Sequence, residues 1–140
     1  MQKSIKIGQI MTDNVIVANP GHSFSQVCRL FLEMGIHHLP VVDADGVCIG
    51  IISSHDVLKA YRYSTSELSA FDDATLDSHL SIERLMTPNP VTLLKTDTIG
   101  NAAELFVQLK IQALPIVDAN NKVIGIISNN DLMREFATLG

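Results

Sequence analysis

Gly50-Ile51-Ile52-Ser53-Ser54-His55-Asp56 is the stretch that decides the fold, because it occurs twice. It returns 75 residues later as Gly125-Ile126-Ile127-Ser128-Asn129-Asn130-Asp131. Laid over each other without a gap, residues 11–61 and 86–136 are identical at 17 of 51 positions. Such an internal repeat indicates two copies of one supersecondary unit. In both copies an apolar run ends in Ser-x-x-Asp, which is typical of a strand that leads directly into a helix N-terminus.

The composition predicts a globular chain with an aliphatic core. Of its 140 residues 46% are hydrophobic and 18% are charged, and Trp is absent. The formal net charge of −5, without any Lys/Arg cluster, argues against a nucleic-acid partner. Neither a signal peptide nor a run of the roughly 18 apolar residues that a membrane span needs is present, so we expect a cytoplasmic chain with no membrane partner. Cys28 and Cys48 lack metal-ligand spacing and are expected to be reduced core thiols.

Hydrophobic periodicity predicts the order β-α-β-β-α in each repeat. In the first repeat we expect a strand at 14–18, a helix that opens with the capping box Ser23-x-x-Gln26 and ends at Gly35, strands at 39–42 and 48–52, and a helix from Ser53 to about Tyr61. In the second we expect a strand near 91–94, a helix at 98–109, strands at 113–117 and 122–127, and a helix from Ser128. One or two helical turns are expected at 5–11.

The chain divides into a first repeat (1–62), a linker (63–81) and a second repeat (82–140). The linker is polar, with Leu68, Phe71 and Leu76 spaced along it, and predicts at most a helical turn packed on the surface. Asp72, Asp73 and Asp77 suggest a metal site, but acidic linkers are usually solvated, and we assign no metal. The predicted fold class is mixed, α+β or α/β.

These motifs resemble the CBS domain family, named for cystathionine β-synthase, and the chain resembles a tandem CBS pair, or Bateman module. Three motifs carry the resemblance in both repeats: Met-Thr before the first strand, Leu-Pro-(Val/Ile)-Val-Asp, and Gly-Ile-Ile-Ser-x-x-Asp. The resemblance covers roughly 7–61 and 82–137. It implies two repeats packed sheet to sheet about a pseudo-twofold axis, with two clefts for adenosine-containing ligands, and a homodimer. We expect the doublet to be a stand-alone module, without an attached catalytic or transport domain.

The Ser-x-x-Asp motif has two compatible interpretations. Structurally, Ser53 caps the helix and Asp56 returns the hydrogen bond, which stabilises by about 1 kcal/mol. In the family, the Asp accepts the ribose hydroxyls and the Ser lies beside the phosphate, where a helix N-terminus favours an anion. We expect both roles, and the same for Ser128 and Asp131.

Three histidines lie near the first motif. His37 and His38 precede Leu39-Pro40, where the regulatory γ subunit of AMP-activated protein kinase carries phosphate-contacting basic residues, and His55 lies inside the motif. Imidazoles there would raise the affinity as the pH falls below about 6.5. A zinc site is conceivable but lacks a clear fourth ligand. Because the second repeat has Gln112, Ala113 and Asn130 instead, the two sites should be unequal.

By resemblance, each cleft takes its ribose and phosphate groups from one repeat and its base pocket from the other. The richer site would combine Ser53, His55, Asp56 and His37 with Thr87, Val91, Ile111 and Gln112. The second would combine Ser128, Asn130 and Asp131 with Thr12, Ile16 and Ile36. The four apolar residues in these sets, Val91, Ile111, Ile16 and Ile36, are in general more often plain core residues.

The sequence therefore predicts a regulatory module that binds AMP, ADP or ATP and signals to an unidentified effector protein. S-adenosylmethionine or NAD would satisfy the same adenosine contacts, whereas the shortage of Arg and Lys disfavours a triphosphate. The alternative is a structural dimerisation module with degenerate clefts. We find no catalytic triad, paired catalytic carboxylates, P-loop or metal cluster, so an enzyme is not expected, and no cofactor is required.

Overall fold

The computed structural model describes residues 4–67 and 77–138, which form a mixed helix and sheet structure, as predicted. The helices and strands in chain order are η2 (Ile7–Gln9, a 3₁₀ helix), α1 (Phe24–Met34), β1 (His38–Val42), β2 (Cys48–Ser53), α2 (Ser54–Glu67), α4 (Ile82–Leu85), β3 (Thr87–Pro88), β4 (Leu93–Leu94), α5 (Ile99–Leu109), β5 (Ala113–Val117), β6 (Val123–Ser128) and α6 (Asn129–Ala137). None of the helices in this described part has the length and apolar character that crossing a membrane requires.

The described residues form two compact units, each built around one three-stranded sheet. The α1–α2 unit contains residues 16–45, 49–67 and 77–89, and the α5–α6 unit contains residues 4–15, 46–48 and 90–138. Each unit therefore also contains the opening segment of the other sequence repeat. Residues 4–15 pack with the second repeat, and the segment that contains α4 and β3 packs with the first.

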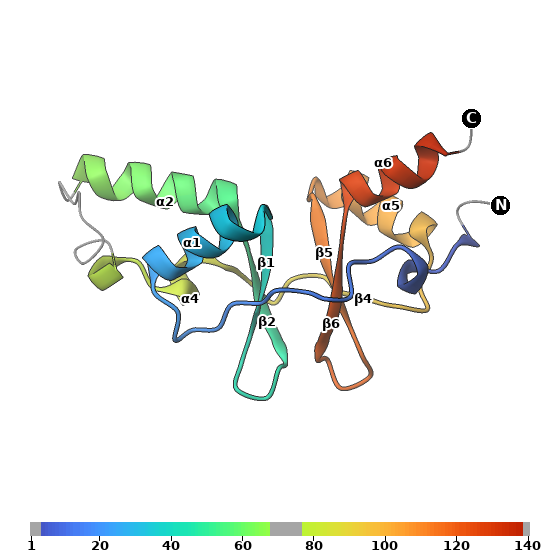
Figure 1. The fold of residues 1–140 in the computed structure, drawn as a ribbon, viewed down its shortest axis with the longest axis horizontal. Helices are drawn as coiled ribbons and strands as arrows, with labels where there is room; N and C mark the ends of the chain where they lie inside the picture. Colours follow the sequence, from blue (N-terminus) through green and yellow to red (C-terminus); the bar gives the residue numbers. More distant parts are fainter. Residues whose placement is uncertain (1–3, 68–76, 139–140) are drawn as a thin grey trace. The chain divides into compact units, whose positions relative to one another are not determined.

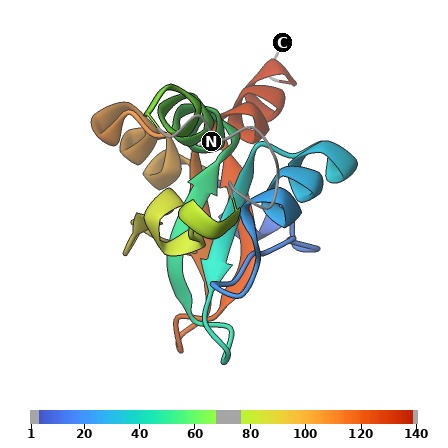
Figure 2. The same ribbon diagram turned by 90° about the vertical axis from the view of Figure 1, so that its left-hand side faces the viewer.

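Strand order in the α1–α2 unit is β1-β2-β3. β3 pairs antiparallel with β2, with Thr87 opposite Ile51. Figure 1 shows α1 and α2 on one face of this sheet, and Figure 2 shows α4 in front of the same sheet. Antiparallel sheets of this kind commonly bury one face only.

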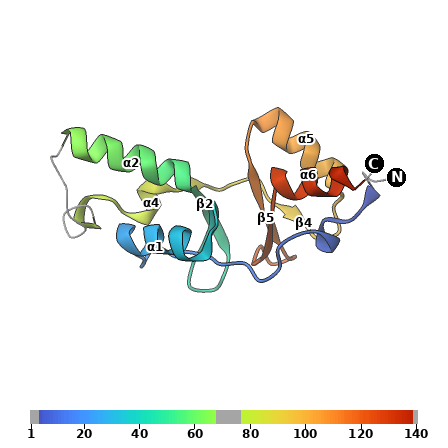
Figure 3. The same ribbon diagram turned by 45° about the horizontal axis from the view of Figure 1, so that its top comes forward.

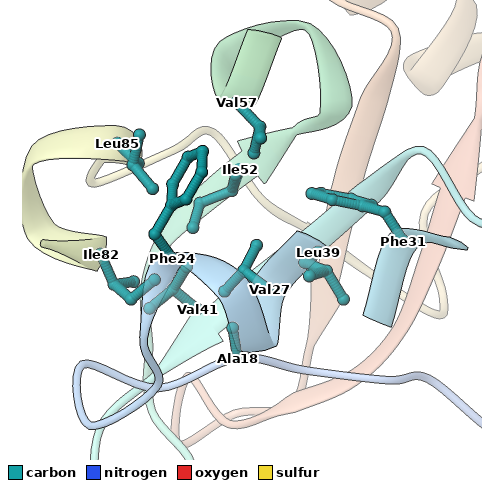
Figure 4. Packing of buried hydrophobic residues seen from close by; sticks show 10 residues of the cluster. All are labelled: Ala18, Phe24, Val27, Phe31, Leu39, Val41, Ile52, Val57, Ile82 and Leu85. Atoms are coloured by element: carbon teal, nitrogen blue, oxygen red, sulfur yellow. The ribbon is translucent and has the colours of Figure 1, made fainter. Parts of the chain in front are cut away.

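The core of the α1–α2 unit is aliphatic apart from two Phe rings, as the composition predicts (Figure 4). Leu39, Val41 and Ile52 of the sheet are fully buried, and Ile82 of α4 is fully buried beside them. Burying an Ile or Leu side chain contributes roughly 1.5–3 kcal/mol. The opening segment of the second repeat is thus part of this core.

Strand order in the α5–α6 unit is β4-β5-β6. β4 runs parallel to β5, and α5 connects them. β5 and β6 are antiparallel, and Ala113 lies opposite Ser128. Figure 3 shows α5 and α6 side by side. Ile7 of η2 is fully buried in this unit's core, so the helical turn predicted at 5–11 is confirmed and has a packing role.

Segment 14–18 is not a strand, and that prediction was wrong. Only Ala18 makes a parallel bridge, to Val41. The reason is that the chain passes from one unit to the other here: Thr12 pairs with Ile126 in the α5–α6 unit, and the α1–α2 unit begins at Ile16. The β-branched side chains of 15–17 are half-buried without a ladder of backbone hydrogen bonds.

The region predicted as linker differs from expectation in two ways. α2 continues to Glu67 rather than ending near Tyr61, because Ser and Thr lower helix propensity only slightly. Asp77 is not simply solvated: its Oδ1 accepts a hydrogen bond from the Ser25 backbone N–H (2.8 Å) and its Oδ2 one from the Ser25 hydroxyl (2.9 Å), in the first turn of α1. The predictions for Leu68, Phe71, Asp72, Asp73 and Leu76 lie outside the described residues.

Candidate ligand-binding site

The two Ser-x-x-Asp motifs cap their helices in the same way. At the start of α2, the Ser53 N–H donates to Asp56 Oδ2 (2.9 Å) and the Asp56 N–H donates to Ser53 Oγ (3.1 Å). At the start of α6, the Ser128 N–H donates to Asp131 Oδ2 (2.7 Å) and the Asp131 N–H donates to Ser128 Oγ (3.3 Å). The capping interpretation is therefore confirmed in both repeats, and each cap uses only one carboxylate oxygen.

A backbone hydrogen bond ties each helix start to the beginning of the neighbouring strand. The Ser54 N–H donates to the His37 carbonyl (2.9 Å), and the Asn129 N–H donates to the Gln112 carbonyl (2.9 Å). His37 and Gln112 are thus held beside the N-termini of α2 and α6. A helix N-terminus carries a partial positive charge, so an anionic group is favoured at this place.

His38 contributes little positive charge at neutral pH. Burial lowers the pKa of His38 below its ordinary value of 6.5, and the neighbouring His37 lowers it further, whereas Asp56 opposes the shift. This changes the expectation drawn from three imidazoles, because His38 becomes protonated only at a lower pH. Within the described residues, no three His, Cys, Asp or Glu side chains gather to hold a metal ion.

The two Asp side chains differ in their second oxygen. Asp131 Oδ1 accepts a hydrogen bond from Arg134, one turn further along α6, in an ion pair. Among the described residues, Asp56 Oδ1 has no hydrogen-bond partner, and Lys59, which corresponds to Arg134, forms no ion pair with it. Sequence reasoning missed Arg134, although an Asp and an Arg three residues apart on a helix are a recognisable pair.

The two predicted threonines lie in the segments that the repeats exchange. Thr87 is exposed in β3, and Thr12 is exposed and pairs with Ile126. Two glycines explain why these segments fit so closely. A Cβ atom at Gly50 would lie 2.9 Å from Met86 Cγ and 3.1 Å from the Thr87 carbonyl oxygen, and Gly125 meets the corresponding Met11 and Thr12.

The remaining predicted site residues have core-like or exposed environments. Ile16 and Ile36 are half-buried against the core of the α1–α2 unit, and Ile111 against that of the α5–α6 unit. Val91 is 44% exposed, and His55 and Asn130 are exposed in the first turns of α2 and α6. Nothing in these environments tests the predicted base contacts.

The predicted sites divide between the units as follows. The α1–α2 unit contains His37, His38, Ser53, His55, Asp56, Thr87, Ile16 and Ile36. The α5–α6 unit contains Thr12, Val91, Ile111, Gln112, Ser128, Asn130 and Asp131. Each unit thus contains one helix cap, one of the two threonines and the strand start that is tied to the cap. The pairing of residues from the two units in shared clefts stays a prediction.

The chain belongs to the CBS domain family: residues 7–63 and 82–138 each match the CBS domain. The crystal structure of CBSX2 in complex with AMP is 27% identical, with a TM-score of 0.79, and the alignment covers 96% of this chain and 98% of that one. The CBS domain pair of protein MJ0100, in complex with 5′-methylthioadenosine and S-adenosylmethionine, is 26% identical with a TM-score of 0.82, at the same coverage.

Among curated relatives, homoserine O-acetyltransferase of Methanococcoides burtonii is 31% identical over 128 residues. The match covers 91% of this chain but only 23% of the acetyltransferase. For the chloroplastic protein CBSX2 of Arabidopsis thaliana, at 27% identity, the match covers 62% of the relative. The chain therefore spans less than two thirds of the length of these relatives, and the acetyltransferase activity is that of a far longer protein.

Proposed function

We propose that this chain is a regulatory module, not an enzyme, that binds an adenosine-containing ligand and passes a conformational change to a partner protein. The observation that carries the proposal is the geometry of Asp56. It caps α2 through Oδ2 and keeps Oδ1 available, beside a helix N-terminus that favours an anion. The carboxylate oxygen can accept a ribose hydroxyl and the partial positive charge favours a phosphate, so the cap suits these two parts of a nucleotide.

The relatives support the same ligand class. CBSX2 is described with AMP, and MJ0100 with 5′-methylthioadenosine and S-adenosylmethionine. These ligands share adenosine and differ in what the 5′ carbon carries. We propose AMP or ADP first, because few Lys or Arg residues lie near either cap to hold a triphosphate. A ligand of this kind acts by binding one conformation of the protein better than another.

A thermal-shift panel tests this proposal. AMP, ADP, ATP, S-adenosylmethionine, NAD and GTP are compared on wild type, Asp56→Ala and Asp56→Asn. A ligand at a hundred times its dissociation constant stabilises by about 2.7 kcal/mol, which for a chain of 140 residues corresponds to a melting shift of about 9 °C. The proposal expects a shift with adenosine compounds that is smaller in both variants, because only the Asp131 site then remains. Asp56→Asn is the matched control, since its amide oxygen can still accept the Ser53 N–H. Flat melts for the whole panel would contradict it.

The exposed apolar side chains favour a homodimer. The α1–α2 unit exposes the apolar side chains of Leu32, Met34, Leu58 and Tyr61. The α5–α6 unit exposes apolar side chains at the corresponding positions, 75 residues later, which are Val107, Leu109, Met133 and Phe136. Leu32 is 81% exposed and Val107 is 78% exposed. Exposed apolar side chains recur at four equivalent positions, so we infer that these helix faces have a common role. Exposed apolar patches of this kind mark protein interfaces.

We propose that a second copy of the chain covers these faces. Sedimentation at micromolar concentration should give a dimer for wild type and a monomer for Leu32→Glu combined with Leu58→Glu. Arg29→Glu, an exposed position on α1 outside the apolar set, is the control and should stay dimeric. A monomeric wild type would contradict the dimer. A dimer that ignores every adenosine compound would instead favour an interaction module with degenerate ligand clefts.

A further inference from the structure

We propose that Arg134 competes with a ligand's ribose hydroxyls for Asp131, and thereby makes Asp56 the stronger of the two carboxylate sites. The inference rests on the proposed function and concerns which site fills first. It makes Arg134 a residue that determines specificity between the sites without itself being required for binding.

The first observation is that both oxygens of Asp131 are engaged. Oδ2 accepts the Ser128 N–H of the helix cap, and Oδ1 accepts a hydrogen bond from the Arg134 guanidinium. The Asp131 side chain is only 11% exposed, whereas Arg134 is 73% exposed. The guanidinium therefore lies on the solvent side of the carboxylate, where a ligand hydroxyl would have to approach.

The second observation is the contrast with α2. Asp56 makes the same cap, but Lys59 stands where α6 has Arg134, and within the described residues Lys59 makes no ion pair with Asp56. An Arg guanidinium is planar and presents several donors in a fixed geometry, whereas a Lys ammonium is a flexible and strongly hydrated point charge. The difference between the caps thus follows from one Lys-to-Arg difference.

The competition should be moderate. Ion pairs with an exposed partner are weak, because water screens the attraction and ordering the side chains costs entropy. A ribose that must displace Arg134 from Asp131 would therefore bind about two- to fivefold more weakly than at an unoccupied carboxylate. The effect sets an order of filling and does not close the second site.

A calorimetric titration with adenosine and 2′-deoxyadenosine tests the inference. Both nucleosides are uncharged, so removing the positive charge of Arg134 does not also remove attraction to a phosphate. The Asp131 site is isolated in the Asp56→Asn variant, and Arg134→Gln is then added. We expect adenosine to bind about two- to fivefold more tightly after the addition, and 2′-deoxyadenosine, which lacks the diol, to bind no better. The reciprocal variant Lys59→Arg, in an Asp131→Asn background, should weaken adenosine binding at Asp56.

The outcomes separate this inference from the proposed function. If wild type binds adenosine but Arg134→Gln leaves the affinity of the Asp131 site unchanged, the inference fails and the proposed function stands. An equal gain for both nucleosides also overturns the inference, because the ribose diol is then not what Arg134 displaces. If neither wild type nor any variant binds adenosine, both proposals fail.

Discussion

The α1–α2 and α5–α6 units share their framework and differ at their functional edges. Both cap the last helix of a repeat with Ser and Asp, both pack a Met-Thr segment of the other repeat against a glycine, and both expose four apolar side chains at matching positions. They differ in the second oxygen of the capping Asp and in the histidines beside α2. The residues that recur in both repeats thus maintain the fold, whereas the neighbouring positions that differ between the repeats distinguish the two sites.

The helix C-termini show the same division. α1 ends at Gly35 and α5 at Lys110, and both residues have left-handed backbone angles, with φ of 63° and 55°. The hairpins repeat this, since Gly46 has φ 83° and its counterpart Asn121 has φ 63°. The second repeat therefore places side chains where the first has glycine, at a conformational cost that glycine avoids.

The largest effect should come from the shared packing around the two glycines. Gly50→Ala would place a Cβ against Met86 and the Thr87 backbone, and we expect a loss of about 1–3 kcal/mol in the free energy of unfolding. Gly125→Ala should cost a similar amount, because its Cβ would lie 2.6 Å from Met11 Sδ and 3.0 Å from the Thr12 carbonyl oxygen. Urea unfolding measures both.

A double-mutant cycle sharpens this prediction. If the clash with the Met86 side chain is the cause, Gly50→Ala combined with Met86→Ala should cost less than the sum of the single variants. Strict additivity, or a harmless Gly125→Ala beside a costly Gly50→Ala, would show that the two units are not packed alike.

Next in size is the contact between Asp77 and Ser25. The α5–α6 unit cannot repeat its hydroxyl hydrogen bond, because Gly100 corresponds to Ser25. Asp77→Ala removes two hydrogen bonds to a carboxylate at the start of α1 and should cost about 1–2 kcal/mol. Asp77→Asn should cost less, since it keeps one acceptor. The exposed Asp13→Ala is the control, and an equal effect from it in thermal unfolding would argue against the contact.

Exchanging the helix C-caps should change stability in opposite directions. Lys110→Gly should stabilise by about 1 kcal/mol, because glycine adopts the left-handed conformation without a steric penalty, and Gly35→Lys should destabilise by about the same amount. Chemical denaturation of both variants measures the difference. A destabilised Lys110→Gly would mean that the Lys110 side chain has a role that its backbone angle does not reveal.

The smallest effect concerns His38, whose counterpart is Ala113. Because burial lowers the pKa of His38 in the folded state, the unfolded chain binds the proton more readily below the ordinary value of 6.5. The contribution of His38 to the free energy of unfolding is therefore fully present above pH 6.5. This contribution decreases as the pH is lowered through 6.5 toward the folded-state pKa. His38→Gln should flatten this part of the pH dependence of unfolding. If the free energy of unfolding of His38→Gln keeps the same slope against pH, a group other than His38 titrates in this range.

Features that are local in sequence could be predicted. The capping box at Ser23, the helices, the paired strands 39–42 and 48–52 and the Ser-x-x-Asp caps all depend on residues within a few positions of one another. The motifs that occur in both repeats then indicated the family. The caps formed by Ser53 with Asp56 and by Ser128 with Asp131 could be predicted because each is a short-range motif, and the role of these residues in binding a ligand stays a prediction.

Features that depend on distant contacts could not be predicted. Segment 14–18 looks like a strand because its residues are β-branched, but it connects Thr12 in one unit to Ala18 in the other. Ile82 begins the second repeat yet lies in the core of the first unit. Asp77 looked like part of an acidic linker, and only the folded chain brings its carboxylate to Ser25, 52 residues away.

The most direct test of the account is a calorimetric titration of AMP into wild type and into the Asp56→Asn, Asp131→Asn double variant. Both amides can keep the helix caps, so equal unfolding curves would establish that the fold is intact. We expect wild type to bind AMP and the double variant to bind it at least tenfold more weakly, which corresponds to a loss of about 1.4 kcal/mol. Equal affinity in the two proteins would contradict a role for these carboxylates in binding ribose.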